Sequence, residues 1–177
     1  MLKLNFYLMR SLAIAGCALA AVLSVSNVYA ANPESVSVQV TFVDAITITE
    51  NAALQYGLLD EALNLETIII APDSGVTGTG TGLIAGGTQA AASLTVGATV
   101  SQSITILVDT IVSGAGYGLG TFICNYDGGT DTACDGAGYG ETSAATAILL
   151  IGATLTGDNT AVPGAANGSF NVTVSYQ

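Results

Sequence analysis

The residues best suited to bind an ion lie in a short acidic loop late in the chain. The run from Asn125 to Asp135 carries three carboxylates and an amide, hard oxygen ligands of the kind that calcium takes. The carboxylates belong to Asp127, Asp131 and Asp135. Their spacing does not match an EF-hand, and acidic side chains are mostly solvated in folded proteins. Calcium is therefore the one candidate ligand, a solvated loop is the alternative, and no other cofactor is expected.

Two cysteines enclose the same loop. Cys124 and Cys134 would both remain in an exported chain, and export is argued below. In an oxidising compartment such a pair is expected to form a disulfide. The bond would close a loop of about ten residues and stabilise the fold by about 2–3 kcal/mol, because it restricts the unfolded chain. Two free thiols are the alternative.

The chain lacks the side chains on which most enzymes depend. It has no His and only two basic residues, Lys3 and Arg10. Hydrolytic triads need a base beside the nucleophile, Schiff-base chemistry needs an amine, and phosphate clamps need arginine. A hydrolase with two catalytic carboxylates needs none of these side chains and is not excluded by their absence. The chain has no Trp, however, to stack on a sugar substrate. We expect no enzymatic activity and name no catalytic residue.

The first 30 residues are typical of a signal peptide. Lys3 and Arg10 precede an apolar run over residues 12–25, and Val28 and Ala30 supply the small residues of a cleavage site. The run is shorter than the roughly 20 residues that span a bilayer. Cleavage after Ala30 predicts a protein that meets the membrane only during export and is secreted, or held at the cell surface, by way of the periplasm.

A lipobox is the second interpretation of this segment. The sequence Ile14-Ala15-Gly16-Cys17 would place a lipidated cysteine at the start of the exported chain. The residues after Cys17 remain apolar, whereas an exported lipoprotein normally turns polar there. Cleavage after Ala30 is therefore preferred, and lipid attachment at Cys17 stays open.

Removal of residues 1–30 would leave a strongly acidic chain. Residues 31–177 contain all 13 Asp and Glu residues and no Lys, Arg or His. Phosphate backbones and anionic lipids repel such a polyanion, so no nucleic-acid partner is expected. The remaining length suits one domain with a core of its own.

This domain is predicted to be all-β. Residues 35–43 alternate, with Val36, Val38, Val40 and Phe42 on one face, as in a half-buried strand. Similar short runs, separated by turn residues, occupy residues 45–49, 54–59, 66–71, 93–96, 103–108, 147–155 and 169–176. Such a series indicates a β-sandwich. Glycine-rich stretches at residues 78–87, 114–120 and 128–140 are expected to be loops or irregular edges.

The last predicted strand has an apolar face made by Phe170, Val172, Val174 and Tyr176. It resembles the C-terminal strand of chaperone–usher pilins, which has a penultimate Tyr, here Tyr176, and a Gly fourteenth from the end, here Gly164. The resemblance implies that a periplasmic chaperone reads this strand first. In that family the strand then lies beside the donor strand of the next subunit.

Most of residues 31–177 also resemble a family of secreted bacterial proteins known only as a domain of unknown function. This likeness implies secretion and an immunoglobulin-like sandwich. Cys124 and Cys134 lie late in the chain, whereas many pilins carry their disulfide near the first strands. The matching pieces are Leu54-Gln55-Tyr56-Gly57, Ile68-Ile69-Ile70-Ala71-Pro72-Asp73-Ser74-Gly75, Ala92-Ser93-Leu94-Thr95-Val96-Gly97 and the stretch from Pro163 to the end.

Two functions follow from these observations. In the first, the protein is a structural pilus-type subunit, and residues 35–43 add a strand to the sheet of another copy or a related subunit. The alternative for this segment is the first strand of its own sandwich. In the second function, the protein is a monomeric secreted module whose loops over residues 114–140 bind a glycan, a receptor or calcium.

Overall fold

The computed structural model describes residues 37–164 and 166–177. Contacts divide the chain into two units, Met1–Val40 and Thr41–Gln177. Of the first unit only residues 37–40 are described, and they form no strand. The predicted signal peptide and Cys17 lie outside the described residues. The described residues contain no helix long and apolar enough to cross a membrane.

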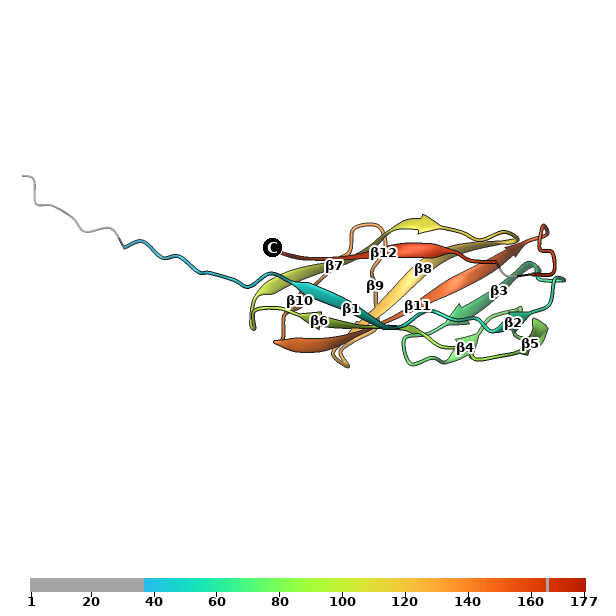
Figure 1. Ribbon diagram of the computed structural model, residues 1–177, viewed down its shortest axis with the longest axis horizontal. Helices are drawn as coiled ribbons and strands as arrows, with labels where there is room; N and C mark the ends of the chain where they lie inside the picture. Colours follow the sequence, from blue (N-terminus) through green and yellow to red (C-terminus); the bar gives the residue numbers. More distant parts are fainter. Residues whose placement is uncertain (1–36, 165) are drawn as a thin grey trace, which may run out of the picture. The chain divides into compact units, whose positions relative to one another are not determined.

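The second unit consists of antiparallel strands in a seven-stranded and a three-stranded sheet, with a further two-stranded ribbon (Figure 1). The larger sheet runs in the order β1-β6-β11-β3-β4, with β8 beside β11 and β9 beside β8. Its strands are β1 (Thr47–Ala52), β3 (Asn64–Ile70), β4 (Val76–Thr77), β6 (Ala92–Gly97), β8 (Tyr117–Tyr126), β9 (Thr132–Ala133) and β11 (Thr146–Asp158). The smaller sheet has the order β10-β7-β12, made of β10 (Tyr139–Thr142), β7 (Ser103–Val112) and β12 (Ser169–Tyr176). The ribbon joins β2 (Leu58–Leu59) to β5 (Ile84–Gly86), and a short 3₁₀ turn, η1 (Thr81–Leu83), precedes β5.

Strand β11 organises the larger sheet. It pairs with β6 and β3 along one side and with β8 along the other. Its alternating buried side chains supply much of the core, as period-two patterning requires. Gly152 is needed within it, because a Cβ there would meet the Ile70 carbonyl of β3.

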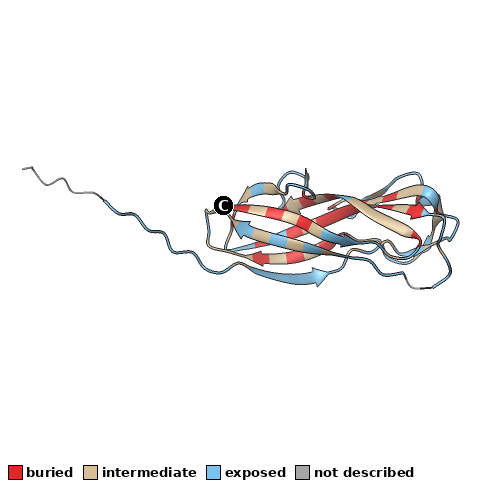
Figure 2. Cartoon of the chain, turned by 90° about the horizontal axis from the view of Figure 1, so that it is seen from above, coloured by how far each residue is buried: buried red, intermediate tan, exposed pale blue. Residues whose placement is uncertain are grey.

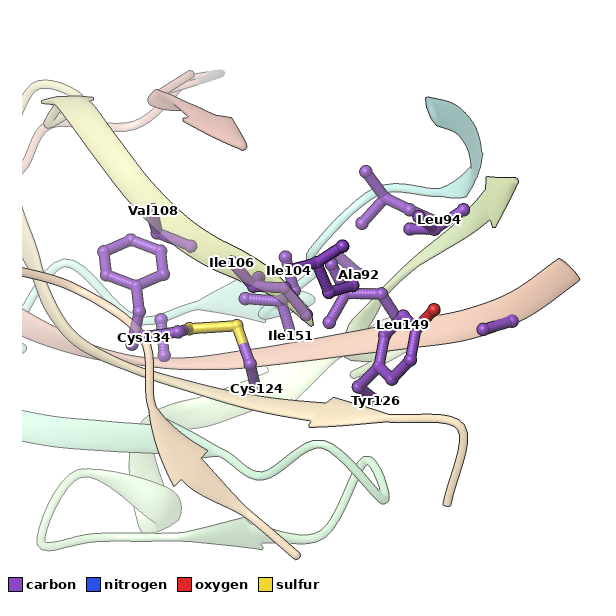
Figure 3. Packing of buried hydrophobic residues seen from close by; sticks show 14 residues of the cluster. Ala92, Leu94, Ile104, Ile106, Val108, Cys124, Tyr126, Cys134, Leu149 and Ile151 are labelled. Carbon is purple, nitrogen blue, oxygen red and sulfur yellow. A yellow bond between two sulfur atoms is a disulfide. The ribbon is translucent and has the colours of Figure 1, made fainter. Parts of the chain in front are cut away.

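The two sheets enclose a continuous apolar core. Figure 3 shows side chains of β6, β7, β8 and β11 packed against one another around the disulfide. The fully buried members include Val96, Ile104, Ile106, Val108, Phe122, Leu149 and Ile151. A second cluster, formed by Leu63, Ile68, Ile70, Ala91 and Leu155, extends the core beneath β3. The prediction of an all-β sandwich is therefore confirmed.

The predicted disulfide is also confirmed. Cys124 and Cys134 are bonded, with their Cα atoms 5.7 Å apart. The Cys134 N–H donates to the Phe122 carbonyl of β8 (3.0 Å), and the Cys134 carbonyl accepts from the Val108 N–H of β7 (2.7 Å). The segment at Cys134 thus connects the larger sheet to the smaller one along one side of the sandwich.

Some boundaries differ from the sequence-based expectation. Residues 117–120 belong to β8, although residues 114–120 were expected to form a loop or an irregular edge. Residues 139–140 likewise open β10. Glycine weakens a strand taken alone, but pairing with a long neighbour such as β11 overrides that preference. Conversely, of residues 54–59 only Leu58–Leu59 form a strand.

Tyr139 supplies a prediction about stability. Its ring packs against the core, and its hydroxyl has no hydrogen-bond partner among the described residues. Burial raises the pKa of this phenol, with the charge of Glu141 adding to the effect. Because an unpaired buried hydroxyl costs free energy, Tyr139→Phe should raise the free energy of unfolding by about 1 kcal/mol at neutral pH. Chemical denaturation measures this.

Tyr126→Phe is the matched control, since the Tyr126 hydroxyl accepts a hydrogen bond from the Ala144 N–H (3.3 Å). That variant should lose stability. Raising the pH above the ordinary phenol pKa of 10.0 favours the unfolded chain, where the phenol ionises more readily. Tyr139→Phe should therefore reduce the loss of stability above about pH 10. A loss of stability in Tyr139→Phe equal to that in Tyr126→Phe would contradict this account.

Candidate functional site

A groove of about 1340 Å³ opens between edges of the two sheets. On one side lies β1, the edge strand of the larger sheet, and on the other lies β12, the edge strand of the smaller sheet. In the described part of the chain neither strand has a partner on its outer side. Apolar side chains of several elements line the groove, among them Ile48, Leu54, Ala92, Leu94, Leu119, Leu155, Phe170 and Val172.

The two strands that border the groove, β1 and β12, leave apolar side chains partly exposed to solvent. All six residues of β1 are exposed, and Figure 2 draws this strand in pale blue. Ile48 lines the groove and keeps 38% of its surface exposed. Along β12, exposed residues alternate with half-buried ones that pack on the core, namely Phe170, Val172, Val174 and Tyr176. The incomplete burial of these side chains is what a sandwich lacking one strand would show.

Among the described residues, β12 is paired along one edge only, so its backbone also has N–H and C=O groups that face no other strand. The Gln177 N–H donates to the Ser103 carbonyl of β7 (3.0 Å). In an antiparallel pair, the backbone N–H and C=O groups of every second residue point to the same neighbouring strand. Those of Thr173 and Ser175 therefore point to β7, as those of Gln177 do. Those of Val172 and Val174 point to the opposite edge of β12. The Val108 N–H, opposite Val172, points to Cys134 and away from β12, as this register requires. Val172 and Val174 therefore direct their N–H and C=O groups toward the open edge.

The segment predicted as the first strand forms no strand in its described residues. We call residues 35–43 the N-terminal arm; Ser35 and Val36 lie outside the described residues. The prediction of a half-buried strand is wrong for residues 37–43, which form no strand. The exposed fraction is 85% for Val38, 67% for Val40 and 90% for Phe42. The alternation is present, but the first strand of the sandwich is β1, and the three described apolar side chains of this face are exposed.

A loop before β12 lines one end of the groove. It includes Gly164, whose φ of +141° favours glycine. Gly168 fits closely, because a Cβ there would meet the Val112 carbonyl and the Tyr117 hydroxyl. The Tyr117 hydroxyl donates to the Ala166 carbonyl (3.3 Å), which ties this loop to β8. Both glycines thus permit the backbone conformation of the loop that lines the groove.

Tyr56 is a firmly held part of the lining. Its hydroxyl donates to the Ala153 carbonyl of β11 (2.7 Å), and its burial raises the pKa of the phenol well above the ordinary value. Its ring is therefore a neutral, fixed surface within the groove at physiological pH.

The acidic loop offers calcium no assembled site. Asp131 accepts a hydrogen bond from the Asn125 side chain (2.7 Å), and Asp135 accepts one from the Phe122 N–H (3.2 Å). Asp127 occupies a turn with φ of +53°. Within the part of the chain that the structure describes, no group of three acidic, Cys or His residues could hold a metal ion. Asp131 and Asp135 thus accept hydrogen bonds from nearby groups, and the carboxylates of Asp127, Asp131 and Asp135 are not brought together.

Comparison with known proteins places the chain in a family. Searches of curated proteins and of solved structures find no match. Residues 46–176 match a domain of unknown function (DUF4402). The matched region begins just before β1, after the arm, and contains both strands that border the groove. This chain therefore belongs to the DUF4402 family.

Proposed function

We propose that this protein is a non-enzymatic structural subunit, exported through the periplasm, that assembles at the cell surface by strand addition. The arm of one copy fills the groove of the next. One observation carries the proposal: the same chain has a groove between two unpaired sheet edges and an exposed segment with the alternation of a missing strand.

The chemistry of the arm suits this groove. Val36, Val38, Val40 and Phe42 would face the apolar lining, while the residues between them face solvent. No residue from 35 to 43 is charged, so docking on an acidic domain meets little repulsion. At about 3.4 Å per residue, nine residues match the eight-residue β12 in length.

The expected energetics favour association. Burying each large apolar side chain of the arm contributes about 1.5–3 kcal/mol. The free N–H and C=O groups of Val172 and Val174 would gain partners in the added strand, as in other complexes formed by β-addition. Covering β12 would also remove an open sheet edge, which otherwise invites unspecific pairing.

Related subunits with a similar arm would fit the same groove, and a periplasmic chaperone could cover it before assembly. The disulfide of Cys124 and Cys134 suits an oxidising compartment. In this proposal the signal peptide is removed after Ala30, which leaves the arm close to the start of the mature chain.

A peptide of residues 34–43 tests the proposal. The recipient is a mature chain with Val40→Asp, whose own arm no longer suits an apolar groove. The peptide should bind this recipient and raise its melting temperature, because ligands that bind only the folded state stabilise it. Calorimetry measures the affinity, and a thermal melt measures the stabilisation.

The control peptide carries Ser in place of Val38 and Val40, which keeps its length and charge. It should bind at least about tenfold more weakly, because it loses two buried apolar side chains. Equal binding of both peptides, or of neither, would refute strand addition through the groove and leave the monomeric binding module as the better account.

A further inference from the structure

The sandwich has another place, besides β1 and β12, where an edge of the larger sheet meets the smaller sheet. On the larger sheet this edge is β8, which carries only the two-residue β9 on its outer side. On the smaller sheet, β10 pairs with β7 only from Ser103 to Ile106. Val108 of β7 therefore lies beyond the last residue that β10 reaches.

Residues 132–135 close this place, and we call them the cystine segment. The Cys134 N–H donates to the Phe122 carbonyl of β8 (3.0 Å), and Asp135 Oδ2 accepts from the Phe122 N–H (3.2 Å). On the other side, the Val108 N–H donates to the Cys134 carbonyl (2.7 Å). The segment therefore gives partners to both backbone groups of Phe122 and to the N–H of Val108.

The cystine segment also takes part in the core. Phe122, Cys124 and Cys134 are fully buried, and Val108 keeps 1% of its surface exposed. All four belong to one packed cluster, and Figure 3 shows Cys134 beside Val108. The segment thus does within its own chain what the proposed function assigns to an arm at the groove: it bonds a sheet edge and packs against apolar side chains.

The disulfide is the strongest constraint on the cystine segment. The connection from β8 to β10 spans residues 127–138, and residues 127–131 at its start are exposed. The strand within it, β9, makes only two residue pairs with β8. A detached connection without a cross-link gains much conformational freedom, whereas one still bonded to Cys124 gains little. Removing the bond between Cys124 and Cys134 should therefore favour detachment.

We infer that the disulfide between Cys124 and Cys134 keeps the cystine segment in place and so confines strand addition to the groove between β1 and β12. Without the disulfide the segment leaves β8 and β7, and a second acceptor for an added strand opens there. The detachment of the segment stands by itself, and the second acceptor rests on the proposed function.

Amide hydrogen exchange in the mature chain tests the detachment. The variant combines Cys124→Ala with Cys134→Ala, which keeps two small apolar side chains in the core. The amides of β11, which has strand partners on both sides, report the opening of the whole domain. Relative to them, the N–H groups of Phe122 and Val108 should exchange about tenfold or more faster in the variant than in the disulfide-bonded chain.

Asn125→Ala is the matched control. The Asn125 side chain donates to the Gly129 carbonyl and to Asp131 (both 2.7 Å), so this variant loosens the same connection and keeps the disulfide. Its relative exchange rates should equal those of the unmodified chain, and the same acceleration in it would overturn the inference. A variant without the cysteines that fails to fold, or whose Phe122 and Val108 amides exchange no faster than those of β11, would overturn it too, because the segment would not open separately.

Peptide binding tests the second acceptor. Both recipients carry Val40→Asp, and calorimetry measures how many peptides of residues 34–43 each chain takes. The disulfide-bonded recipient should take one and the recipient without cysteines should take two. One peptide in both, with the faster exchange present, would overturn the second acceptor. No binding to the disulfide-bonded recipient would overturn the proposed function and leave the exchange result standing.

Discussion

A mature chain carrying Val40→Asp should fold normally and fail to assemble. Val40 is mostly exposed in the isolated chain, so the substitution removes little buried surface and should leave the melting temperature unchanged. In the groove the same side chain would place an unpaired charge against apolar walls, at a cost of several kcal/mol. That cost corresponds to a loss of more than about a hundredfold in association. Light scattering over a concentration series measures the assembly.

Gln39→Asp is the matched control, because it adds the same charge to the other face of the arm. It should weaken assembly far less than Val40→Asp. An equal effect of the two substitutions would show that charge alone governs association and that the alternation of the arm plays no part.

Deleting residues 169–177 should abolish folding. The deletion removes β12, the partner of β7 in the smaller sheet, and with it the contacts of Phe170 and Val174 with the core. Each of these side chains contributes about 1.5–3 kcal/mol, and a whole domain is stable by only about 5–15 kcal/mol. Circular dichroism of the purified chain, or its degradation after export, measures the outcome.

A single substitution in β12 tests the same contribution to stability without removing the strand. Val172→Asp should lower the free energy of unfolding by about 2–3 kcal/mol, because it puts a charge on the core face of β12. Thr173→Asp, on the exposed face, should cost much less. A cooperative melt at the usual temperature for the deletion would show that β12 is not part of the folded domain.

The strands with clear alternation were predictable from the sequence. β12 occupies the residues that its apolar stripe indicates, and β7 and β11 contain the predicted runs and extend beyond them. The disulfide was predictable from two cysteines and the expectation of export. Local patterning sufficed here because alternation and cysteine chemistry depend on near neighbours.

Two features were not predictable in this way: that the glycine-rich start of β8 is a strand, and what the arm packs against. β8 is a strand because β11 pairs with it, and no local signal reports such a distant partner. The alternation of the arm predicts that its apolar side chains become buried. It does not indicate whether they pack against the same chain or against another molecule. The groove is lined by residues of β1 and β12, which are far apart in the sequence, so only the fold reveals it.

Residue-resolved hydrogen exchange of β12 tests the central claim most directly. In the Val40→Asp recipient without peptide, the N–H groups of Val172 and Val174 should exchange fast, and those of Thr173 and Ser175, bonded to β7, should exchange slowly. Adding the peptide of residues 34–43 should slow exchange at Val172 and Val174 by about tenfold or more, because the added strand accepts their hydrogen bonds. Unchanged fast exchange at both residues with the peptide bound would contradict strand addition at this edge.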